Sequence, residues 1–249
     1  MHITTNKTAK TMKIGQSQYI TDVLARSGMD QCNATSTPID LNQKLTEEMC
    51  PNNDDKLQQM KDVPYMEAVG SLLFAAQITR PDVCFVVNML SRFSQNPSKA
   101  RRNAVKRGMR YLKGTVDKSL IYIGKSSEII GFCDADWDSD IDSRRSTTGY
   151  VFIHQGAAIS WATRRQRTIA LSTTEAKFMS LVAAVQEFIW FNRFQKELIG
   201  AVTKSMVIYC DNRSAIHIAT NKAKLISEAI KNDKIVLQYF ETNNMLADL

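Results

Sequence analysis

The order of the apolar segments in the second half of the chain is the strongest constraint on its fold. Three short segments rich in apolar and β-branched residues are followed by one long segment with helical periodicity and then by another short apolar segment. This series predicts an antiparallel meander, a helix, and a fourth strand parallel to the first. With one more strand near the end, we predict a mixed sheet covered by helices. The predicted strands are residues 129–137, 147–154, 157–162, 206–211 and 234–240, and the predicted helix is residues 172–198.

Two aspartates lie at the strand ends that this topology brings together. Asp134 belongs to the first strand and Asp211 ends the fourth. Since neighbouring parallel strands end at the same edge of a sheet, these carboxylates should be close in space. Asp134 also opens a series at spacing two that continues with Asp136, Asp138 and Asp140. Crowded oxygen ligands indicate a magnesium site, whereas a polar turn and a helix N-cap at Asp211 would explain the same residues without a metal.

The predicted long helix directs a lysine toward the sheet. Ser172 and Glu175 have the spacing of a capping box, so Ser172 is expected to be the N-cap. Leu181 lies on the apolar stripe, and one turn earlier on the same stripe is Lys177. Glu175 is about 200° away from Lys177 around the helix, at about 100° per residue. We therefore expect Lys177 to face the sheet and Glu175 to cap the helix.

The first half of the chain is predicted to be mostly helical after a mixed N-terminal segment and a polar linker. The third predicted helix carries a basic stripe of Arg102, Lys106, Arg110 and Lys113, which fall within roughly 80° of arc. A nucleic-acid backbone could bind such a stripe, and the commoner alternative is a solvated helix face. The predicted helices are residues 65–78, 82–93 and 98–112.

The charge and cysteine patterns favour an intracellular protein with a polyanionic partner. Residues 101–125 contain eight Lys and Arg and one acid, Asp117, so their net charge of +7 equals that of the whole chain. A concentrated basic patch favours nucleic acid. Five scattered cysteines without a CxxC pair argue against a disulfide framework or a zinc site. No apolar run is long enough for a membrane span and the N-terminus lacks a signal peptide, so we expect location in the cytoplasm or nucleus.

Short motifs occur in a distinctive order along nearly the whole chain. Gly-Phe-Cys-Asp-Ala-Asp-Trp (131–137), residues 143–152, Ile-Ser-Trp (159–161), Ala-Leu-Ser-Thr-Thr-Glu-Ala (170–176) and Cys-Asp-Asn-Arg-Ser-Ala (210–215) resemble the RNase H domain of copia-type retrotransposon Pol polyproteins. Residues 65–73, 79–82, 90–93, 96–98, 104–107 and 111–115 resemble the segment that joins reverse transcriptase to RNase H there. Residues 17–20 and 36–38 resemble the end of the transcriptase.

The resemblance implies an RNase H fold and cleavage of the RNA strand in RNA–DNA hybrids. Two Mg²⁺ ions held by four carboxylates would activate water and stabilise the leaving oxygen. By motif, Asp134 matches the first carboxylate, Asp211 the third and Asp248 the fourth. The implied partners are RNA–DNA hybrid or another nucleic acid, and a reverse transcriptase. The transcriptase's own Tyr/Phe-x-Asp-Asp motif is absent, so polymerase activity is not expected.

The resemblance also implies how the chain is divided. Residues 1–62 would be a remnant of the C-terminal region of reverse transcriptase with a linker, and residues 63–125 a helical connection segment with the basic stripe. Residues 126–249 would be an RNase H-like α/β domain, shortened at its C-terminus, with a mixed five-stranded sheet and flanking helices.

One departure from the family pattern concerns the active site itself. The second carboxylate is expected directly after Thr-Glu-Ala, where this chain has Lys177. An ammonium there removes a ligand and repels a divalent cation. We therefore expect Lys177 to form ion pairs with Asp134 and Asp211 in place of the metals, and the nuclease to be weak or inactive. The alternatives are a non-catalytic nucleic-acid-binding remnant that uses the basic stripe, and a fragment without function.

Overall fold

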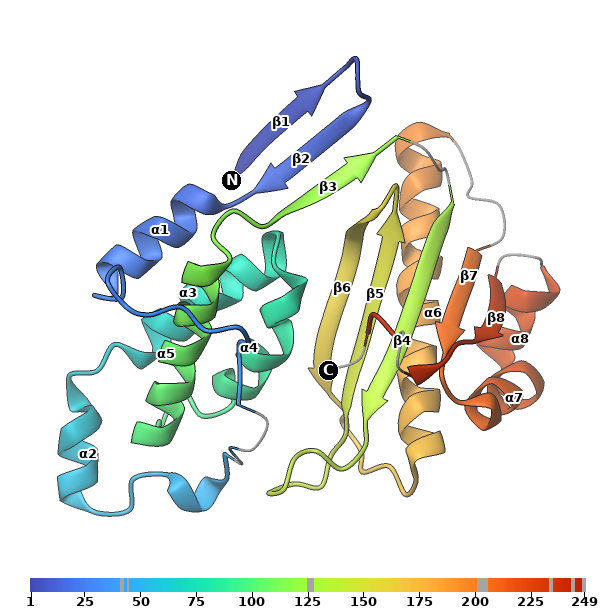
Figure 1. Ribbon diagram of the computed structural model, residues 1–249. Coiled ribbons are helices and arrows are strands. Elements are labelled where there is room, and N and C mark those ends of the chain that lie inside the picture. The colour runs from blue at the N-terminus through green and yellow to red at the C-terminus, as the bar shows by residue number, and fades with distance from the viewer. Residues whose placement is uncertain are drawn as a thin grey trace. The chain divides into compact units, whose positions relative to one another are not determined.

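The chain forms two compact units. The structure is a computed structural model that describes residues 1–40, 43, 45–124, 128–200, 206–232, 235–242 and 245–247. Unit 1 is Met1–Ile121 and unit 2 is Tyr122–Leu249 (Figure 1). Residues of the predicted segments 1–62 and 63–125 share one apolar core in unit 1. The division of the chain into three parts at residues 62 and 125 stays a prediction. Among the described residues, no helix has the length and hydropathy needed to cross a membrane.

Unit 1 is built around helices that pack through one apolar core. Ile20, Leu72, Leu90 and Met109 are each almost fully buried there and come from four different helices. Pro81 opens a short 3₁₀ turn between two of them, because proline is well suited to the first turn of a helix. The helices of this core are α1 (Ser17–Arg26), α3 (Tyr65–Ile78), η2 (Pro81–Val83), α4 (Cys84–Ser91) and α5 (Lys99–Gly114). The predicted helical segments are thus confirmed, with the second one split at Val83.

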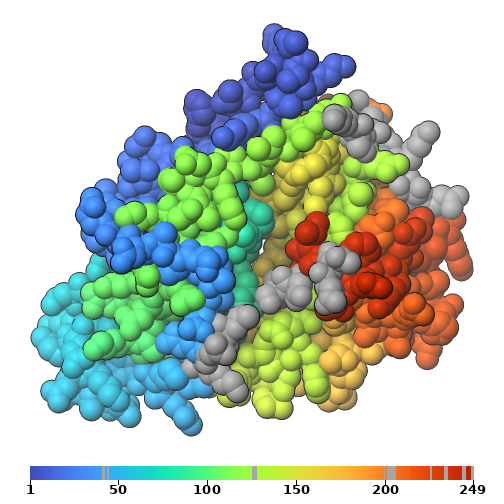
Figure 2. All heavy atoms as spheres, viewed as in Figure 1, coloured from blue at the N-terminus to red at the C-terminus, as the bar shows by residue number. Residues whose placement is uncertain are grey.

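The sequence did not reveal an N-terminal hairpin and a short exposed helix. Strands β1 (His2–Asn6) and β2 (Thr11–Gly15) pair antiparallel, and every residue of β1 is exposed. Figure 2 shows this hairpin, in dark blue, at the surface of unit 1. Helix α2 (Asp54–Lys61) has no buried residue, and the short turn η1 (Glu47–Met49) precedes it. Elements without a buried face leave no apolar periodicity in the sequence.

Unit 2 contains the predicted mixed sheet. Its strand order is β6-β5-β4-β7-β8, with β4 parallel to β7 and antiparallel to β5. This order and these directions are those of an RNase H-like fold, so the predicted fold class is confirmed. Strand β3 (Ser119–Ile123) is the third strand of the N-terminal sheet, and the boundary between the units falls within it. The strands of unit 2 are β4 (Ile129–Asp136), β5 (Thr147–His154), β6 (Ala157–Arg165), β7 (Met206–Cys210) and β8 (Ile235–Tyr239).

Helix α6 (Thr173–Ile199) packs against this sheet and begins as predicted. The Ser172 hydroxyl accepts a hydrogen bond from the Glu175 backbone N–H, and the Glu175 carboxylate accepts one from the Leu171 N–H. Gly200 ends the helix in the left-handed conformation, with φ of 67°. The buried side chains of α6 and the sheet, among them Leu181 and Phe188, form the core of unit 2.

The chain after β7 differs from the prediction in its cap and its helices. Asn212, not Asp211, is the N-cap of α7 (Arg213–Lys222), since its side chain accepts a 2.8 Å hydrogen bond from the Ala215 N–H. A further helix, α8 (Lys224–Lys231), precedes β8. The helix expected near the C-terminus falls mostly on residues outside the described ones.

Arg101 is buried in unit 1, although the sequence analysis counted it in the basic patch. Its guanidinium donates to the Thr46 carbonyl at 2.6 Å and to Cys50 Sγ at 3.0 Å, and it lies over the Phe93 ring. The side chain is fully buried, so this cation cannot contact a ligand at the surface.

We expect Arg101→Ala to lower the free energy of unfolding of unit 1 by about 2–4 kcal/mol. The change leaves a cavity and removes the donor to a partly buried carbonyl. Amide hydrogen exchange in α5 would measure the loss. Arg102→Ala, the adjacent control, should change stability by less than about 0.5 kcal/mol. Equal effects of the two changes would contradict the structural role of Arg101.

Candidate functional site

The sheet places Asp134 and Asp211 at corresponding positions of two neighbouring strands. In the parallel pair of β4 and β7, Phe132 is the partner of Tyr209. Each aspartate follows its member of this pair by two residues, so both carboxylates lie at the same edge of the sheet. The predicted proximity of the two residues is therefore confirmed by the register.

Lys177 of α6 joins the two carboxylates. Its Nζ lies 2.8 Å from Asp134 Oδ1 and 2.5 Å from Asp211 Oδ2. The side chain of Lys177 is 16% exposed, and those of Asp134 and Asp211 are 6% and 3% exposed. The ammonium thus lies between two buried carboxylates, which is the arrangement expected from the helical periodicity. We call Lys177, Asp134 and Asp211 the Lys–Asp site.

Burial and pairing act in opposite directions on these groups. Burial lowers the pKa of Lys177, but the hydrogen bonds and charges of Asp134 and Asp211 outweigh it, so the pKa of this lysine is raised. Burial raises the pKa of Asp134, and the nearby Asp211 charge adds to this effect. The Lys177 hydrogen bond and charge only partly oppose it, and the pKa of Asp134 remains raised. The lysine therefore stays charged and holds the site together electrostatically.

Other hydrogen bonds fix the two aspartates in place. Asp134 Oδ1 also accepts from the Ala135 N–H at 2.7 Å, and Asp211 Oδ2 accepts from the Thr242 hydroxyl at 2.8 Å. Ser180, which the sequence analysis did not single out, donates to the carbonyl oxygens of Asp134 and Gly149 at 2.5 and 3.0 Å. The signal that could have identified Ser180 is a polar residue on the apolar stripe, three positions after Lys177.

The residues of the Lys–Asp site do not fit a divalent cation. One oxygen of each aspartate is bound to the Lys177 ammonium, which repels a second cation. Asp211 Oδ1 is buried without a hydrogen-bond partner among the described residues. In the part of the chain that the structure describes, no group of three or more His, Cys, Asp or Glu could hold a metal ion. Asp248, the expected fourth carboxylate, lies outside the described residues.

Asp136 is the last residue of β4, and the other two aspartates of the series, Asp138 and Asp140, lie in the turn after it. Asp138 has a φ of 61° and forms an ion pair with Arg144. Asp140 accepts from Arg165 at 2.9 Å and from the Ser143 hydroxyl at 2.5 Å. These pairs organise the turn, as the polar-turn interpretation predicts.

The four residues of the basic stripe do not act alike. Arg110 Nε donates to the Asn33 carbonyl at 2.6 Å, and Lys113 Nζ donates to the Cys32 carbonyl at 2.7 Å. These two cations hold the segment that follows α1. Arg102 and Lys106 have no side-chain hydrogen bond or ion pair with any residue that the structure describes.

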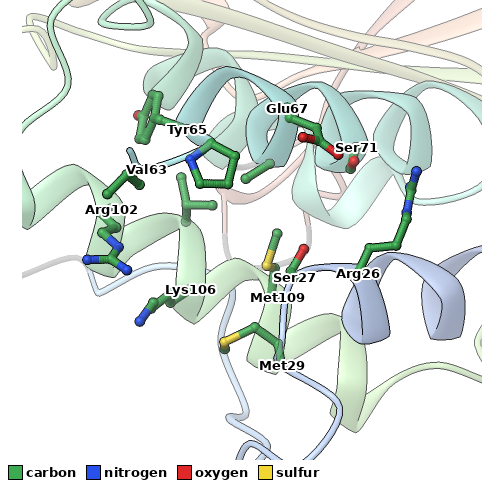
Figure 3. A pocket seen from close by; sticks show the side chains of 13 residues that line it. Arg26, Ser27, Met29, Val63, Tyr65, Glu67, Ser71, Arg102, Lys106 and Met109 are labelled. Atoms are coloured by element: carbon green, nitrogen blue, oxygen red, sulfur yellow. The ribbon is translucent and has the colours of Figure 1, made fainter. Parts of the chain in front are cut away.

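Arg102 and Lys106 line a cavity of about 110 Å³ in unit 1. In Figure 3 they lie on the same side of this cavity, and Glu67 and Arg26 lie on the opposite side. Met109 forms part of its apolar wall. Two of the four stripe cations are thus bound to backbone carbonyls, and the other two have no such partner among the described residues.

The chain is similar in sequence to transposon polyproteins. No family model matches it. It is 38% identical over 261 residues, covering 100% of this chain, to the retrovirus-related Pol polyprotein from transposon TNT 1-94 of Nicotiana tabacum. It is also 34% identical over 211 residues, covering 84% of this chain, to the retrovirus-related Pol polyprotein from transposon RE2 of Arabidopsis thaliana. The chain spans 20% and 14% of the lengths of these two polyproteins.

A shorter relative and a solved structure are also similar to parts of the chain. The secreted RxLR effector protein 161 of Plasmopara viticola is 42% identical over 132 residues, which are 53% of this chain and 93% of that protein. LC11-RNase H1, solved in complex with an RNA/DNA hybrid, is 11% identical with a TM-score of 0.34 and covers 48% of this chain and 89% of that one. This structural similarity is distant, and the fold class rests on the strand order and register of unit 2.

Proposed function

This chain belongs to the retrovirus-related Pol polyproteins of copia-type transposons, and we propose that it binds RNA–DNA hybrids without cleaving them efficiently. Unit 2 is the RNase H-like domain of such a polyprotein. The observation that carries the proposal is the Lys177 ammonium between the Asp134 and Asp211 carboxylates.

The chemistry of phosphodiester hydrolysis explains why this lysine impairs cleavage. The reaction needs an activated water and stabilisation of charge on the leaving oxygen. In the Lys–Asp site, Asp134 and Asp211 are engaged by Lys177 and by neighbouring donors, so neither is available as a base for water. A charged ammonium cannot accept a proton. The second oxygen of Asp211, Oδ1, is buried.

The proposed binding activity rests on cations that the fold leaves without partners. Arg102 and Lys106 are one turn apart on α5 and make no ion pair with a described residue, so they can neutralise adjacent phosphates. We expect Arg102→Gln with Lys106→Gln to weaken hybrid binding and to make the slope of log affinity against log salt shallower by about 2 units.

A fluorescence titration with a labelled RNA–DNA hybrid at several salt concentrations would measure this effect. Lys10→Gln with Lys13→Gln removes the same charge from exposed positions of the N-terminal hairpin and should leave the slope unchanged. No affinity for the hybrid at low salt would reject the proposed function. Equal affinity for a DNA duplex would favour the alternative, a general nucleic-acid-binding remnant.

Cleavage is tested on the same hybrid in buffer with Mg²⁺. The unaltered chain is expected to leave the RNA strand intact under conditions where an active RNase H degrades it. Degradation at a comparable rate would show that Lys177 does not block the site.

A further inference from the structure

A second cavity lies in unit 2 between the edge strand β6 and helix α6, with a volume of about 440 Å³. Tyr150 pairs with Ala162 across β5 and β6, and Thr148 pairs with Arg164. Because alternate residues of a strand share a face, these side chains and Gln166 form one wall. The residues of α6 that line the cavity are Met179, Ala183, Gln186 and Glu187.

Gln166, which lines this cavity, has an unused hydrogen-bond acceptor. Its side chain is only 6% exposed, and its Nε2 donates to the Thr148 hydroxyl and the Ala176 carbonyl, both at 3.0 Å. These two bonds fix the amide, so the orientation of Oε1 is determined as well. Oε1 is buried and has no partner among the described residues. Buried acceptors are nearly always paired, and a ligand with an N–H or O–H group could satisfy this one.

The two ends of the cavity carry opposite charges. Arg164 and Arg167 are exposed and make no side-chain hydrogen bond or ion pair with a described residue, whereas Arg165 is bound to Asp140. The other end contains Glu187, which accepts a 2.7 Å hydrogen bond from the Ser160 hydroxyl. Burial, followed by the Glu187 charge, raises the pKa of Tyr150 to about 12, so its phenol stays neutral.

The length of the cavity can be estimated from α6. Thr168 contacts Met179 at 3.5 Å near the basic end, and Glu187 is eight residues further along the helix. At about 1.5 Å per residue, the two ends are about 12 Å apart. A ligand that spans them needs an anionic group at one end and hydrogen-bond donors at the other.

We propose that this cavity binds a phosphorylated nucleoside. The phosphate would contact Arg164 and Arg167, a ribose hydroxyl would reach Gln166 Oε1 near that end, and the amino group of the base would reach the Glu187 carboxylate. The volume is within the range of about 300–1,000 Å³ that is typical of small-molecule sites. The nucleoside phosphate could be a free nucleotide or the phosphorylated end of a nucleic-acid strand. This site uses none of the residues of the Lys–Asp site and does not depend on the proposed hybrid binding.

Calorimetry with adenosine monophosphate and the purified chain tests the site. Arg164→Gln with Arg167→Gln is expected to weaken binding by at least about tenfold, because two charge-assisted hydrogen bonds are lost. The control, Arg193→Gln with Lys196→Gln, removes two exposed cations of α6 and should leave the affinity unchanged. The NMR signals of the Gln166 side-chain amide should shift on addition of the nucleotide.

The choice of probes distinguishes the sources of the ligand and can overturn the proposal. If a 5′-phosphorylated DNA oligonucleotide binds as well as the nucleotide and competes with it, the ligand is the end of a strand. If only the free nucleotide binds, the cavity is a small-molecule site. The proposal is wrong if the nucleotide does not bind at millimolar concentration. It is also wrong if inorganic phosphate or adenosine binds equally well, or if the control variant loses as much affinity as the double arginine variant.

Discussion

Lys177→Glu is expected to create Mg²⁺-dependent cleavage of RNA–DNA hybrids. The change replaces the ammonium between Asp134 and Asp211 by a third carboxylate, which converts a cation-repelling site into one with hard oxygen ligands. We expect the cleavage rate to rise at least about a hundredfold above that of the unaltered chain, because metal ions contribute several kcal/mol to such reactions. The measurement is the rate of RNA-strand cleavage in a labelled hybrid.

Lys177→Met is the matched control for this experiment. It removes the ammonium but supplies no ligand, so it should not gain cleavage. The unfolding midpoint of the glutamate variant should also rise with Mg²⁺ concentration, since a metal that binds the folded state stabilises it. The interpretation fails if the glutamate variant folds and responds to Mg²⁺ but does not cleave, or if the methionine variant gains the same activity.

The largest expected effect on stability also comes from Lys177. At neutral pH, Lys177→Met should lower the free energy of unfolding of unit 2 by about 3–5 kcal/mol, because it leaves two buried carboxylates without their cation. Chemical denaturation followed by fluorescence would measure the loss. Lys196→Met, an exposed lysine of the same helix, should cost less than about 0.5 kcal/mol.

The pH dependence of this effect follows from the two shifted pKa values. The pKa of Lys177 is raised in the folded state, so its stabilising contribution is fully present below the unfolded value of about 10.4 and is lost as the pH rises through the folded pKa. The pKa of Asp134 is also raised, and a protonated Asp134 needs no cation. The cost of Lys177→Met should therefore shrink toward about pH 4 and above about pH 10.4. A cost independent of pH would show that lost packing, and not lost charge, destabilises the variant.

Local sequence patterns were sufficient for most regular elements that have a buried face, and α8, which buries Ile226, is an exception. The periodicity around Leu181 placed Lys177 on the correct side of α6, and the spacing of Ser172 and Glu175 located the first turn of that helix. Both patterns arise within a few residues of the chain. Strand β1 escaped prediction because all its residues are exposed and carry no such pattern.

The fates of individual charged residues could not be predicted in the same way. Arg101 and Arg102 are adjacent in the sequence, yet the first is buried against Thr46 and Cys50 and the second lines a cavity. Arg110 and Lys113 are held by carbonyl groups about 80 residues earlier in the chain. The side chain of an arginine or lysine is usually exposed to solvent unless a distant segment supplies hydrogen-bond acceptors for it. Which acceptors come close enough is known only from the packed chain.

The sequence by itself therefore determined the meander of β4, β5 and β6 with β7 parallel to β4, the face of α6 that carries Lys177, and the positions of Asp134 and Asp211 at strand ends. Those features follow from hydrophobic periodicity and from the rule that neighbouring parallel strands end at one edge. Only the tertiary structure decided that one ammonium bonds both carboxylates, that Gln166 Oε1 is left without a partner, and that two of the four stripe cations bind backbone carbonyls. These outcomes depend on distances between side chains from different elements, which are set when the elements pack.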